Sequence, residues 1–316
     1  MRDQISKCHP TRRSALLSIG AGTAGLSLLS MGDLGHAFAK ASAPRIRWAQ
    51  GWLLWQSQKL PLKQAISDLA AVGAEGIEYS PGEGDPDKQG FTHQELLSLL
   101  KEKKLRVSGM YFPIKSCDPG ARAEVLAAAR KRIAAMKAYD VGCMVMAAPN
   151  VDPQAALGAD SIKQLGLVLN DVGRLAREEG VQVGLHPHLN TIVETPTEIE
   201  QAMAATDPAL VKLSADTGHI HLGGGDVVGL LKKHGRRLNY LHFKDAVRPF
   251  KRPHFNPNLR ELGRGEVDFV GVMHLLKKLK FKGWINIEQD SSKLTATEAS
   301  AASMQFVNGT LKKIYT

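Results

Sequence analysis

Short apolar runs alternate with helix-period segments from about residue 45 onward. The runs are nearly continuous in aliphatic residues, which is typical of strands that are buried on both faces. They predict eight strands, at residues 46–51, 76–80, 106–112, 143–148, 181–188, 211–216, 238–244 and 284–289.

Each predicted strand is followed by a segment with the period of a helix. Thr92 is a candidate N-cap and Pro196 fits a first helical turn, while Gly180 and Gly283 fit helix C-terminal ends. The segments predict eight helices, at roughly residues 60–72, 93–103, 120–139, 158–179, 196–205, 226–234, 267–280 and 297–313.

Eight strand–helix units predict an α/β fold with a single (β/α)8 TIM barrel, spanning residues 40–316. The alternative is an open doubly wound sheet, in which a glycine-rich phosphate loop follows the first strand. Here the first strand is followed by Trp52-Leu53-Leu54-Trp55, and the glycines at 223–225 come after the sixth strand without the spaced fingerprint. In a barrel, chemistry belongs at the C-terminal ends of the strands.

Residues 1–39 have the pattern of a cleaved export signal. Arg12 and Arg13 precede an uncharged stretch at 14–32, and residues 37–39 read Ala-Phe-Ala, a small-x-small cleavage site. The paired arginines resemble the twin-arginine signal of bacteria. An uncleaved anchor is the alternative, but glycines and serines make the stretch weakly apolar. We therefore expect a periplasmic or secreted protein that meets the twin-arginine export machinery and has no stable membrane insertion after cleavage.

The composition is that of an ordinary globular protein, with 43% hydrophobic and 23% charged residues among 316, which excludes a disordered chain or a disulfide-rich miniprotein. The net charge of +10 suggests nucleic acid or a membrane surface as a partner. Five of the 41 basic and two of the 31 acidic residues lie within residues 1–40, however, which leaves +7 for the rest. Cys143 in an apolar run and Cys117 in a loop do not indicate a disulfide.

Polar residues gather at the C-terminal ends of the predicted strands. Because side chains alternate along a strand, each pair within one strand end lies on one face. Two carboxylates and several imidazoles at one barrel mouth predict a divalent-metal site of borderline type, such as Mn, Zn, Co or Fe. Without a cation, several buried charges would surround one pocket at a high cost in free energy. The residues are Glu78, His186, His188, Asp216, His219, His242, Lys244, Asn286 and Glu288.

These segments resemble the sugar phosphate isomerase/epimerase superfamily, the xylose isomerase-like TIM barrels. The resemblance rests on residues 184–195, 216–219, 241–245, 262–269 and 287–288, and it covers the whole mature chain. The His-x-His and Thr-x-x-Glu pattern followed by Asp-Thr-Gly-His is most similar to the inosose dehydratase branch.

The resemblance implies one divalent metal ion (Mn, Co, Zn or Mg), held by residues from strands five to eight. Asp216, His242 and Glu288 match the family pattern directly. Many members have Glu at the fourth position, where this chain has His186. Either His186 takes that place, as we expect, or Glu194 reaches back from the following loop.

Further roles follow from the same resemblance. Glu194 resembles a second acid that contacts substrate, and His188 and His219 resemble proton-shuttling residues, with orientation of the metal ligands as the alternative. Lys244 is a candidate for polarising a substrate oxygen or for neutralising Asp245. The candidate substrate-binding residues are Glu78, Trp52 and Arg264. Trp55 is a further candidate for the wall of a sugar pocket, with core packing as the alternative.

The loop at 246–266 follows the seventh predicted strand and is long enough to suggest a lid over the mouth. It carries several cations that are candidates for attracting an anionic substrate group, with solvated surface charge as the alternative. Arg264 is the preferred one because it lies in the family-like stretch.

We expect an exported, divalent-metal-dependent isomerase or epimerase of a sugar, keto-sugar or cyclitol. Its metal would stabilise an enediolate formed by proton abstraction alpha to a carbonyl. The alternative is a dehydratase or lyase acting on a keto-cyclitol or 3-keto-glycoside at the same site. An endonuclease IV-like nuclease and a non-catalytic sugar-binding barrel are weaker alternatives, and nucleic acid is not an expected partner. The sequence does not predict the oligomeric state.

Overall fold

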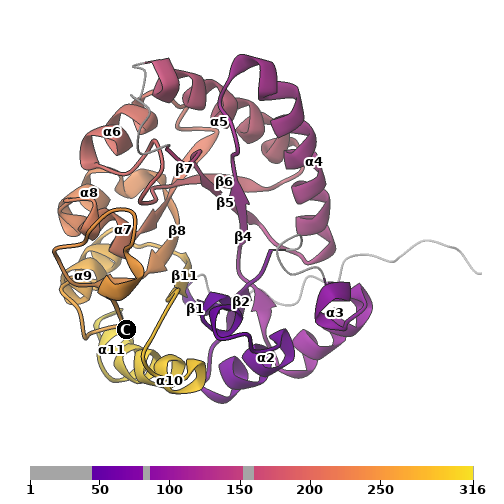
Figure 1. Ribbon diagram of the computed structural model, residues 1–316, viewed down its shortest axis with the longest axis vertical. Helices are drawn as coiled ribbons and strands as arrows, with labels where there is room; N and C mark the ends of the chain where they lie inside the picture. The colour runs from indigo at the N-terminus through magenta and orange to yellow at the C-terminus, as the bar shows by residue number, and fades with distance from the viewer. Residues whose placement is uncertain (1–44, 81–85, 152–159, 316) are drawn as a thin grey trace, which may run out of the picture. The chain divides into compact units, whose positions relative to one another are not determined.

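A ring of parallel strands surrounded by helices forms the body of the protein (Figure 1). The computed structural model describes residues 45–80, 86–151 and 160–315, so the predicted export signal lies outside the described residues. The strands of the ring are β1 (Ile46–Gly51), β2 (Gly76–Glu78), β3 (Arg106–Val107), β4 (Met110–Pro113), β5 (Cys143–Ala147), β6 (Gln182–His186), β7 (Val211–Asp216), β8 (Leu238–Phe243) and β11 (Gly283–Ile287). The predicted TIM barrel is confirmed.

The third predicted strand is divided into β3 and β4, and the division closes the barrel. The strand order runs β3-β2-β1-β11-β8-β7-β6-β5-β4, so the chain changes partner from β2 to β5 at Ser108–Gly109. The ring of Tyr240 lies there, 3.0 Å from the point where a Cβ on Gly109 would be, and its hydroxyl bonds Ser108 Oγ at 2.8 Å. Beyond the division, the backbone N–H of Tyr111 in β4 donates to Ser80 Oγ at 2.7 Å. This hydrogen bond joins the segment after β2 to β4.

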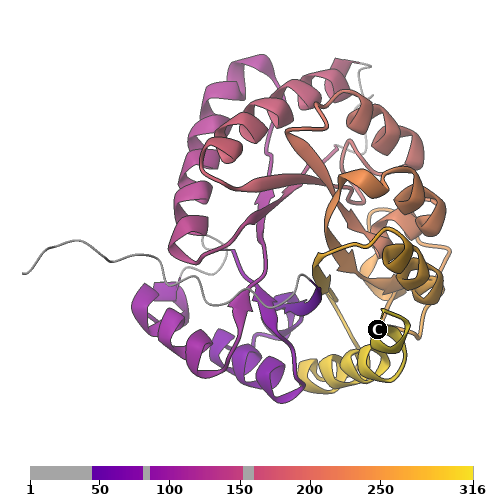
Figure 2. The same ribbon diagram turned by 180° about the vertical axis from the view of Figure 1, so that it is seen from behind.

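Helices surround the strands on every side (Figure 1, Figure 2). The eight predicted helices are all present, the last of them divided into α10 and α11, and two short helices that the sequence pattern did not predict, α1 and α7, follow β1 and β7. The helices are α1 (Leu53–Ser57), α2 (Leu62–Ala71), α3 (His93–Glu102), α4 (Arg122–Ala138), α5 (Asp160–Glu178), α6 (Pro196–Ala204), α7 (Thr217–Leu222), α8 (Val227–Lys233), α9 (Phe269–Lys278), α10 (Ala296–Phe306) and α11 (Lys312–Tyr315).

Helix starts follow capping chemistry that the sequence encodes. Thr92 accepts a hydrogen bond from Glu95 N, and the Glu95 carboxylate accepts one from Thr92 N, which is a capping box. The same reciprocal pair begins α6 at Thr195 and α10 at Thr295. These caps fix where the loops at the C-terminal ends of the strands give way to helices.

The apolar core lies between the strands and the helices. Trp48 and Phe243, on the outward faces of β1 and β8, meet edge to face at 5.8 Å, and Phe243 also packs against Phe269 of α9. Trp55 belongs to this core: it is 1% exposed, and its indole N–H donates to Asp68 at 2.9 Å. Fully burying a large apolar side chain stabilises the fold by roughly 1.5–3 kcal/mol.

The loop at 246–266 is ordered by one carboxylate. Asp245 accepts hydrogen bonds from four backbone N–H groups, those of Ala246, Gly263, Gly265 and Val267. A Cβ on Gly265 would lie 2.2 Å from Asp245 Oδ1, so only glycine fits there. Strands β9 (Asp245–Ala246) and β10 (Leu259–Arg260) pair within the loop, whose two ends are thereby held together.

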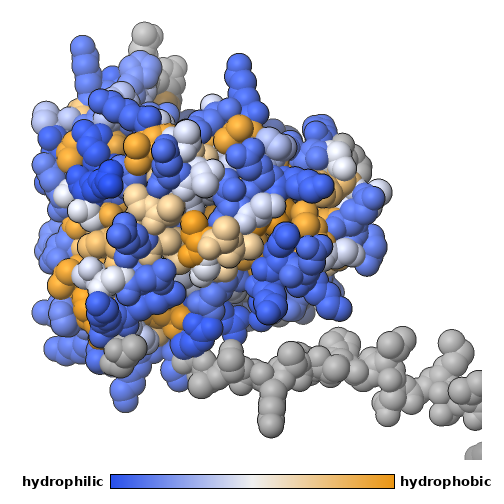
Figure 3. Space-filling model, turned by 90° about the horizontal axis from the view of Figure 1, so that it is seen from below, coloured by the Kyte–Doolittle hydropathy of each residue, from blue (hydrophilic) through white to orange (hydrophobic). Residues whose placement is uncertain are grey.

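The face shown in Figure 3 is largely hydrophilic, with hydrophobic residues in groups between the hydrophilic ones. Among the described residues, Leu167 and Val270 are the large hydrophobic side chains that are exposed. None of the described helices has the length and apolarity that a membrane span requires.

Candidate active site

The C-terminal ends of four neighbouring strands carry the four predicted metal ligands. His186 and Asp216 end β6 and β7, His242 is the last but one residue of β8, and Glu288 directly follows β11. Asp216 and His242 are direct partners in the β7–β8 register. All four side chains are buried, between 0% and 8% exposed.

Each of these four side chains has one buried polar atom without a hydrogen-bond partner. The atoms are His186 Nδ1, Asp216 Oδ2, His242 Nδ1 and Glu288 Oε2. His242 Nδ1 lies 2.7 Å from Glu288 Oε2 and 3.8 Å from Asp216 Oδ2, although the shorter contact lacks hydrogen-bond angles. Ligand atoms of His186, Asp216 and His242 lie within 4.8 Å of one another. The unpaired atoms therefore converge on one region.

This convergence fits a divalent cation. A buried polar atom without a hydrogen-bond partner costs about 1–3 kcal/mol, and the 2.7 Å contact between His242 Nδ1 and Glu288 Oε2 offsets only part of that cost here. Two carboxylates and two imidazoles are a donor set suited to borderline divalent metals. The four residues therefore support a divalent-metal site.

A second set of contacts orients these side chains. Glu78 Oε2 lies 2.7 Å from His242 Nε2, which leaves Nδ1 of the same ring directed at Asp216 and Glu288. This carboxylate–histidine pairing is typical of imidazoles that bind metals. Asp216 Oδ1 accepts the backbone N–H of His219 at 2.8 Å, which caps α7 and leaves Oδ2 unpaired.

Burial and neighbouring charges shift the pKa values of these groups. Burial lowers the pKa of His186 well below its usual value and raises the pKa of Asp216 to about 6. For Glu288 burial acts upward, but the positive His242 and Lys244 outweigh it and hold its pKa well below the usual value. Burial acts downward on His242, and the carboxylates of Glu288 and Glu78 outweigh it and raise its pKa well above the usual value.

Lys244 is a fully buried cation next to the four candidate ligands. Its Nζ donates to Asp290 at 3.0 Å and to Glu288 at 3.2 Å, and it lies 3.1 Å from His219 Nε2. Burial acts to lower its pKa, but the surrounding carboxylates raise it well above the usual value, so the amine is charged. The partner of Lys244 is thus Asp290, whereas Asp245 orders the loop.

His188 and His219 form a pair of imidazoles in contact beside this ammonium, with their rings tilted at 45° to each other. Their ring centroids are 3.8 Å apart, and Phe255 from the 246–266 loop lies edge-on to both. His188 Nδ1 lies 2.6 Å from Leu189 O, so Nδ1 carries the proton and Nε2 is the acceptor. Burial is the main cause that lowers the pKa of both imidazoles, which keeps them neutral.

The carboxylate of Glu194 pairs with groups other than the candidate metal ligands. One carboxylate oxygen accepts the backbone N–H of Asn190 at 2.7 Å, and the other pairs with Arg252 of the 246–266 loop. Asn190 also donates through its side chain to Pro253 O at 3.0 Å. Glu194 therefore docks the loop against the end of β6, whereas His186 lies with Asp216 and His242 in one group of potential ligand atoms.

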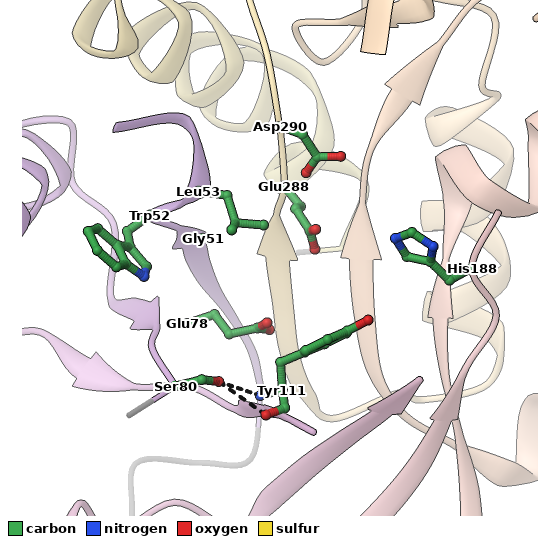
Figure 4. Close-up of a pocket in the computed structure, with 9 residues that line it drawn as sticks. All are labelled: Gly51, Trp52, Leu53, Glu78, Ser80, Tyr111, His188, Glu288 and Asp290. Carbon is green, nitrogen blue, oxygen red and sulfur yellow. Dashed lines mark hydrogen bonds between the residues drawn. The ribbon is translucent and has the colours of Figure 1, made fainter. Parts of the chain in front are cut away.

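A cavity of about 200 Å³ opens beside this cluster (Figure 4). The hydroxyl of Tyr111 reaches across it toward His188, and Glu78 reaches in from the opposite side. Of the predicted substrate-binding residues, Trp52 and Glu78 line the cavity and Arg264 does not. The lining residues are Gly51, Trp52, Leu53, Glu78, Ser80, Tyr111, His188, Glu288 and Asp290.

Three polar or aromatic groups at this site, Asp290, Tyr111 and Phe255, were not predicted from the sequence. Asp290 is two residues beyond Glu288, and Tyr111 ends the third predicted strand, so alternation along a strand could have found both. Asn286 was placed on the right face, but its two unpaired side-chain atoms were not expected. Phe255 gave no signal, because its place depends on how the long loop folds.

Known proteins resemble this chain in sequence and in fold. An inosose dehydratase of Lactiplantibacillus plantarum is 27% identical, over 83% of this chain and 95% of its own length. The solved IolI protein with a bound zinc atom superposes with a TM-score of 0.73 at 18% identity, covering 85% of this chain and 99% of that one. D-psicose 3-epimerase of Clostridium cellulolyticum, solved with D-tagatose, gives a TM-score of 0.69 at 16% identity, covering 85% and 99%.

Such relatives are enzymes, and the prediction that this chain is an enzyme is confirmed. The fold likeness agrees with the barrel predicted from the strand pattern. A model of the xylose isomerase-like TIM barrel matches residues 66–309, and the chain belongs to that family.

Proposed function

We propose that the protein is a metal-dependent dehydratase or lyase that eliminates water from a polyhydroxylated ketone such as a keto-cyclitol, or an alcohol from a 3-keto-glycoside. The observation that carries this function is the convergence of four unpaired donor atoms, from His186, Asp216, His242 and Glu288, beside a cavity with a neutral histidine. The inosose dehydratases at 27–29% identity support dehydration in particular.

The four ligand residues would hold a divalent ion, with Mn, Co, Zn and Mg as the candidates. Such an ion supplies a Lewis acid for the carbonyl and adjacent hydroxyl oxygens of the substrate. Glu78 keeps the ring of His242 in the orientation in which Nδ1 faces the other ligands.

His188 is the residue best placed to move the proton. Its Nε2 is an acceptor, its low pKa keeps it neutral, and it lines the cavity. It would take the proton from the carbon alpha to the carbonyl and give it to the hydroxyl that leaves from the β-carbon. The C–H and C–O bonds break, a C=C bond forms, and the products are an enone and water.

Lys244 and Phe255 prepare the site for this transfer. The ammonium of Lys244 is held by Asp290 and Glu288 next to His219, where it stabilises negative charge on substrate oxygens. Phe255 lies edge-on against the paired imidazoles of His188 and His219, where it would shield them from water. Trp52 and Tyr111 supply aromatic walls for the ring of the substrate.

An isomerase or epimerase is the second candidate. Glu78 and His188 enter the cavity from opposite sides, as the removal and return of a proton on two faces requires (Figure 4). Glu194, in contrast, is held by Arg252 and Asn190, and it is not among the residues that line the cavity.

A substrate panel in D2O distinguishes the two reactions. Keto-sugars, keto-cyclitols and 3-keto-glycosides would be incubated with the metal-loaded protein and followed by NMR. A dehydratase produces an enone with loss of the β-hydroxyl, whereas an epimerase produces a stereoisomer that carries deuterium. Full activity in His242→Ala and Glu288→Gln would contradict both.

We also propose that residues 1–39 direct export through the twin-arginine pathway and are then removed. The paired arginines, the weakly apolar stretch and the Ala-Phe-Ala site support this proposal. Replacing Arg12 and Arg13 by lysine should leave the precursor in the cytoplasm of a bacterial host. Periplasmic recovery of the doubly substituted chain at the normal level would contradict twin-arginine export.

A further inference from the structure

A second cavity, of about 500 Å³, lies between the loop after β8 and the loop after β11. Arg264, which does not line the catalytic cavity, lies here instead. The lining residues are Asn256, Pro257, Leu259, Arg260, Glu261, Arg264, Ser291, Ser292, Lys293 and Leu294.

The charge of this cavity is positive. Arg260, Arg264 and Lys293 line it, against a single carboxylate, Glu261. Arg264 Nη1 lies 3.7 Å from Glu261 Oε2, which is long for a hydrogen bond, and its side chain is 59% exposed. Lys293 has no ion pair within the described part of the chain.

The carboxylate of Glu261 is already committed to holding the walls together. It is 8% exposed, and its Oε1 accepts hydrogen bonds from Ser292 at 2.6 Å and from Gln289 at 3.1 Å. It thereby ties the loop after β8 to the loop after β11. Glu261 therefore acts as a structural anchor and neutralises the three cations only in part.

Arg260 is fixed against the wall of the cavity. Its Nη1 donates to Leu259 O at 2.7 Å and to Pro257 O at 2.9 Å. A guanidinium held through one nitrogen keeps its orientation and still has further N–H donors for a ligand. Such a fixed donor loses little conformational entropy when a ligand binds.

The position of the cavity in the barrel points to the same kind of ligand. The strands β8 and β11 are the seventh and eighth of the barrel, and TIM barrels frequently bind phosphate groups between the loops that follow these two strands. Ser291 Oγ donates to Asn256 O at 3.0 Å across the wall. Their neighbours Asp290 and Phe255 lie on the catalytic side, so the two cavities share this wall.

We infer that this second cavity binds an anionic oxygen group, phosphate or carboxylate, through Arg260, Arg264 and Lys293. The group belongs either to a substrate that extends over the shared wall or to a separate small anion. The cavity does not depend on which reaction takes place at the metal ligands.

Inorganic phosphate is the probe that tests this site. It would be titrated calorimetrically into the metal-loaded protein at low ionic strength, where surface charges are least screened. The Arg264→Gln/Lys293→Gln double variant should weaken phosphate binding at least tenfold. The matched control, Lys131→Gln/Arg177→Gln, removes the same charge from exposed positions on α4 and α5 and should change binding less than twofold.

Two outcomes would overturn the inference. Phosphate binding that is equally weakened in the control would be an effect of net charge alone. Binding that survives in the double variant and is lost in His242→Ala would belong to the metal site.

Kinetics separate the two sources of the anion. If the group belongs to the substrate, the double variant raises KM for phosphorylated or carboxylated keto-sugars and leaves KM for neutral ones unchanged. If the anion is separate, phosphate binds equally well in the presence and absence of a neutral keto-sugar.

Discussion

The mouth of the barrel and the interior one layer below it are both buried, but they differ in whether their buried polar atoms have hydrogen-bond partners. Below the mouth, Cys143, Val145 and Tyr240 form an apolar cluster, and the Tyr240 hydroxyl is paired with Ser108 at 2.8 Å. At the mouth, buried atoms of His186, Asp216, His219, His242, Asn286 and Glu288 have no hydrogen-bond partner. The polar group of the lower layer is therefore satisfied within the protein, whereas the polar atoms at the mouth are arranged to bind a ligand such as a metal ion.

The largest expected effect is at the mouth. His242→Ala or Glu288→Gln removes a donor from the proposed metal site, and activity should fall by about 10³-fold or more. The folded state should persist, because each substitution changes the mouth of the barrel and leaves the apolar core between strands and helices intact. Steady-state kinetics and circular dichroism of the same samples measure both quantities.

In the layer below the mouth, we expect a substitution to lower stability and to leave activity nearly unchanged. Val145→Ala removes buried methyl groups and should lower the free energy of unfolding by about 1.5–3 kcal/mol. Metal affinity and kcat should stay within about twofold, since Val145 packs with Cys143 and Tyr240 below the mouth. Urea unfolding and metal titration measure this, and a loss of metal binding would show that the two layers are not separable.

An intermediate effect is expected for Glu78. Glu78→Gln keeps the shape of the side chain and weakens the orientation of His242, so metal affinity should fall by about 10- to 100-fold. A role in substrate contact alone would raise KM and leave metal affinity unchanged. Titration of the metal-free protein, beside measurement of KM, decides between these roles.

The smallest expected effect concerns the loop. Arg252→Ala removes the pairing of a half-exposed guanidinium with Glu194, and such a pair is worth at most about 1 kcal/mol. We expect KM to rise by roughly fivefold or less, with metal affinity unchanged. A loss of metal binding in this variant would indicate that Glu194 and not His186 is a ligand.

The sequence predicted the barrel because apolar runs and helix periods are local signals that buried strands and amphipathic helices leave directly in the chain. It also placed His186, Asp216 and His242 at neighbouring strand ends, since the C-terminal ends of parallel strands meet. The interruption of the third strand was not predicted, because it depends on the ring of Tyr240, more than 100 residues away.

Dependence on residues that are distant in the sequence also explains which parts of the site were not predicted. The pairing of Glu194 with Arg252, and the place of Arg264 in a second cavity, follow from how the 246–266 loop folds back on itself. That fold is set by one carboxylate, Asp245, and by backbone N–H groups up to 22 residues away, which carry no pattern in the sequence.

Metal binding to the purified barrel is the most direct test of the contrast between the two layers. Titration of the metal-free protein with Mn, Co or Zn should give about one ion per chain and raise the melting temperature. Asp216→Asn should abolish both effects, and Val145→Ala should retain them. Absence of binding, or binding that is unchanged in Asp216→Asn and His186→Ala, would contradict the account.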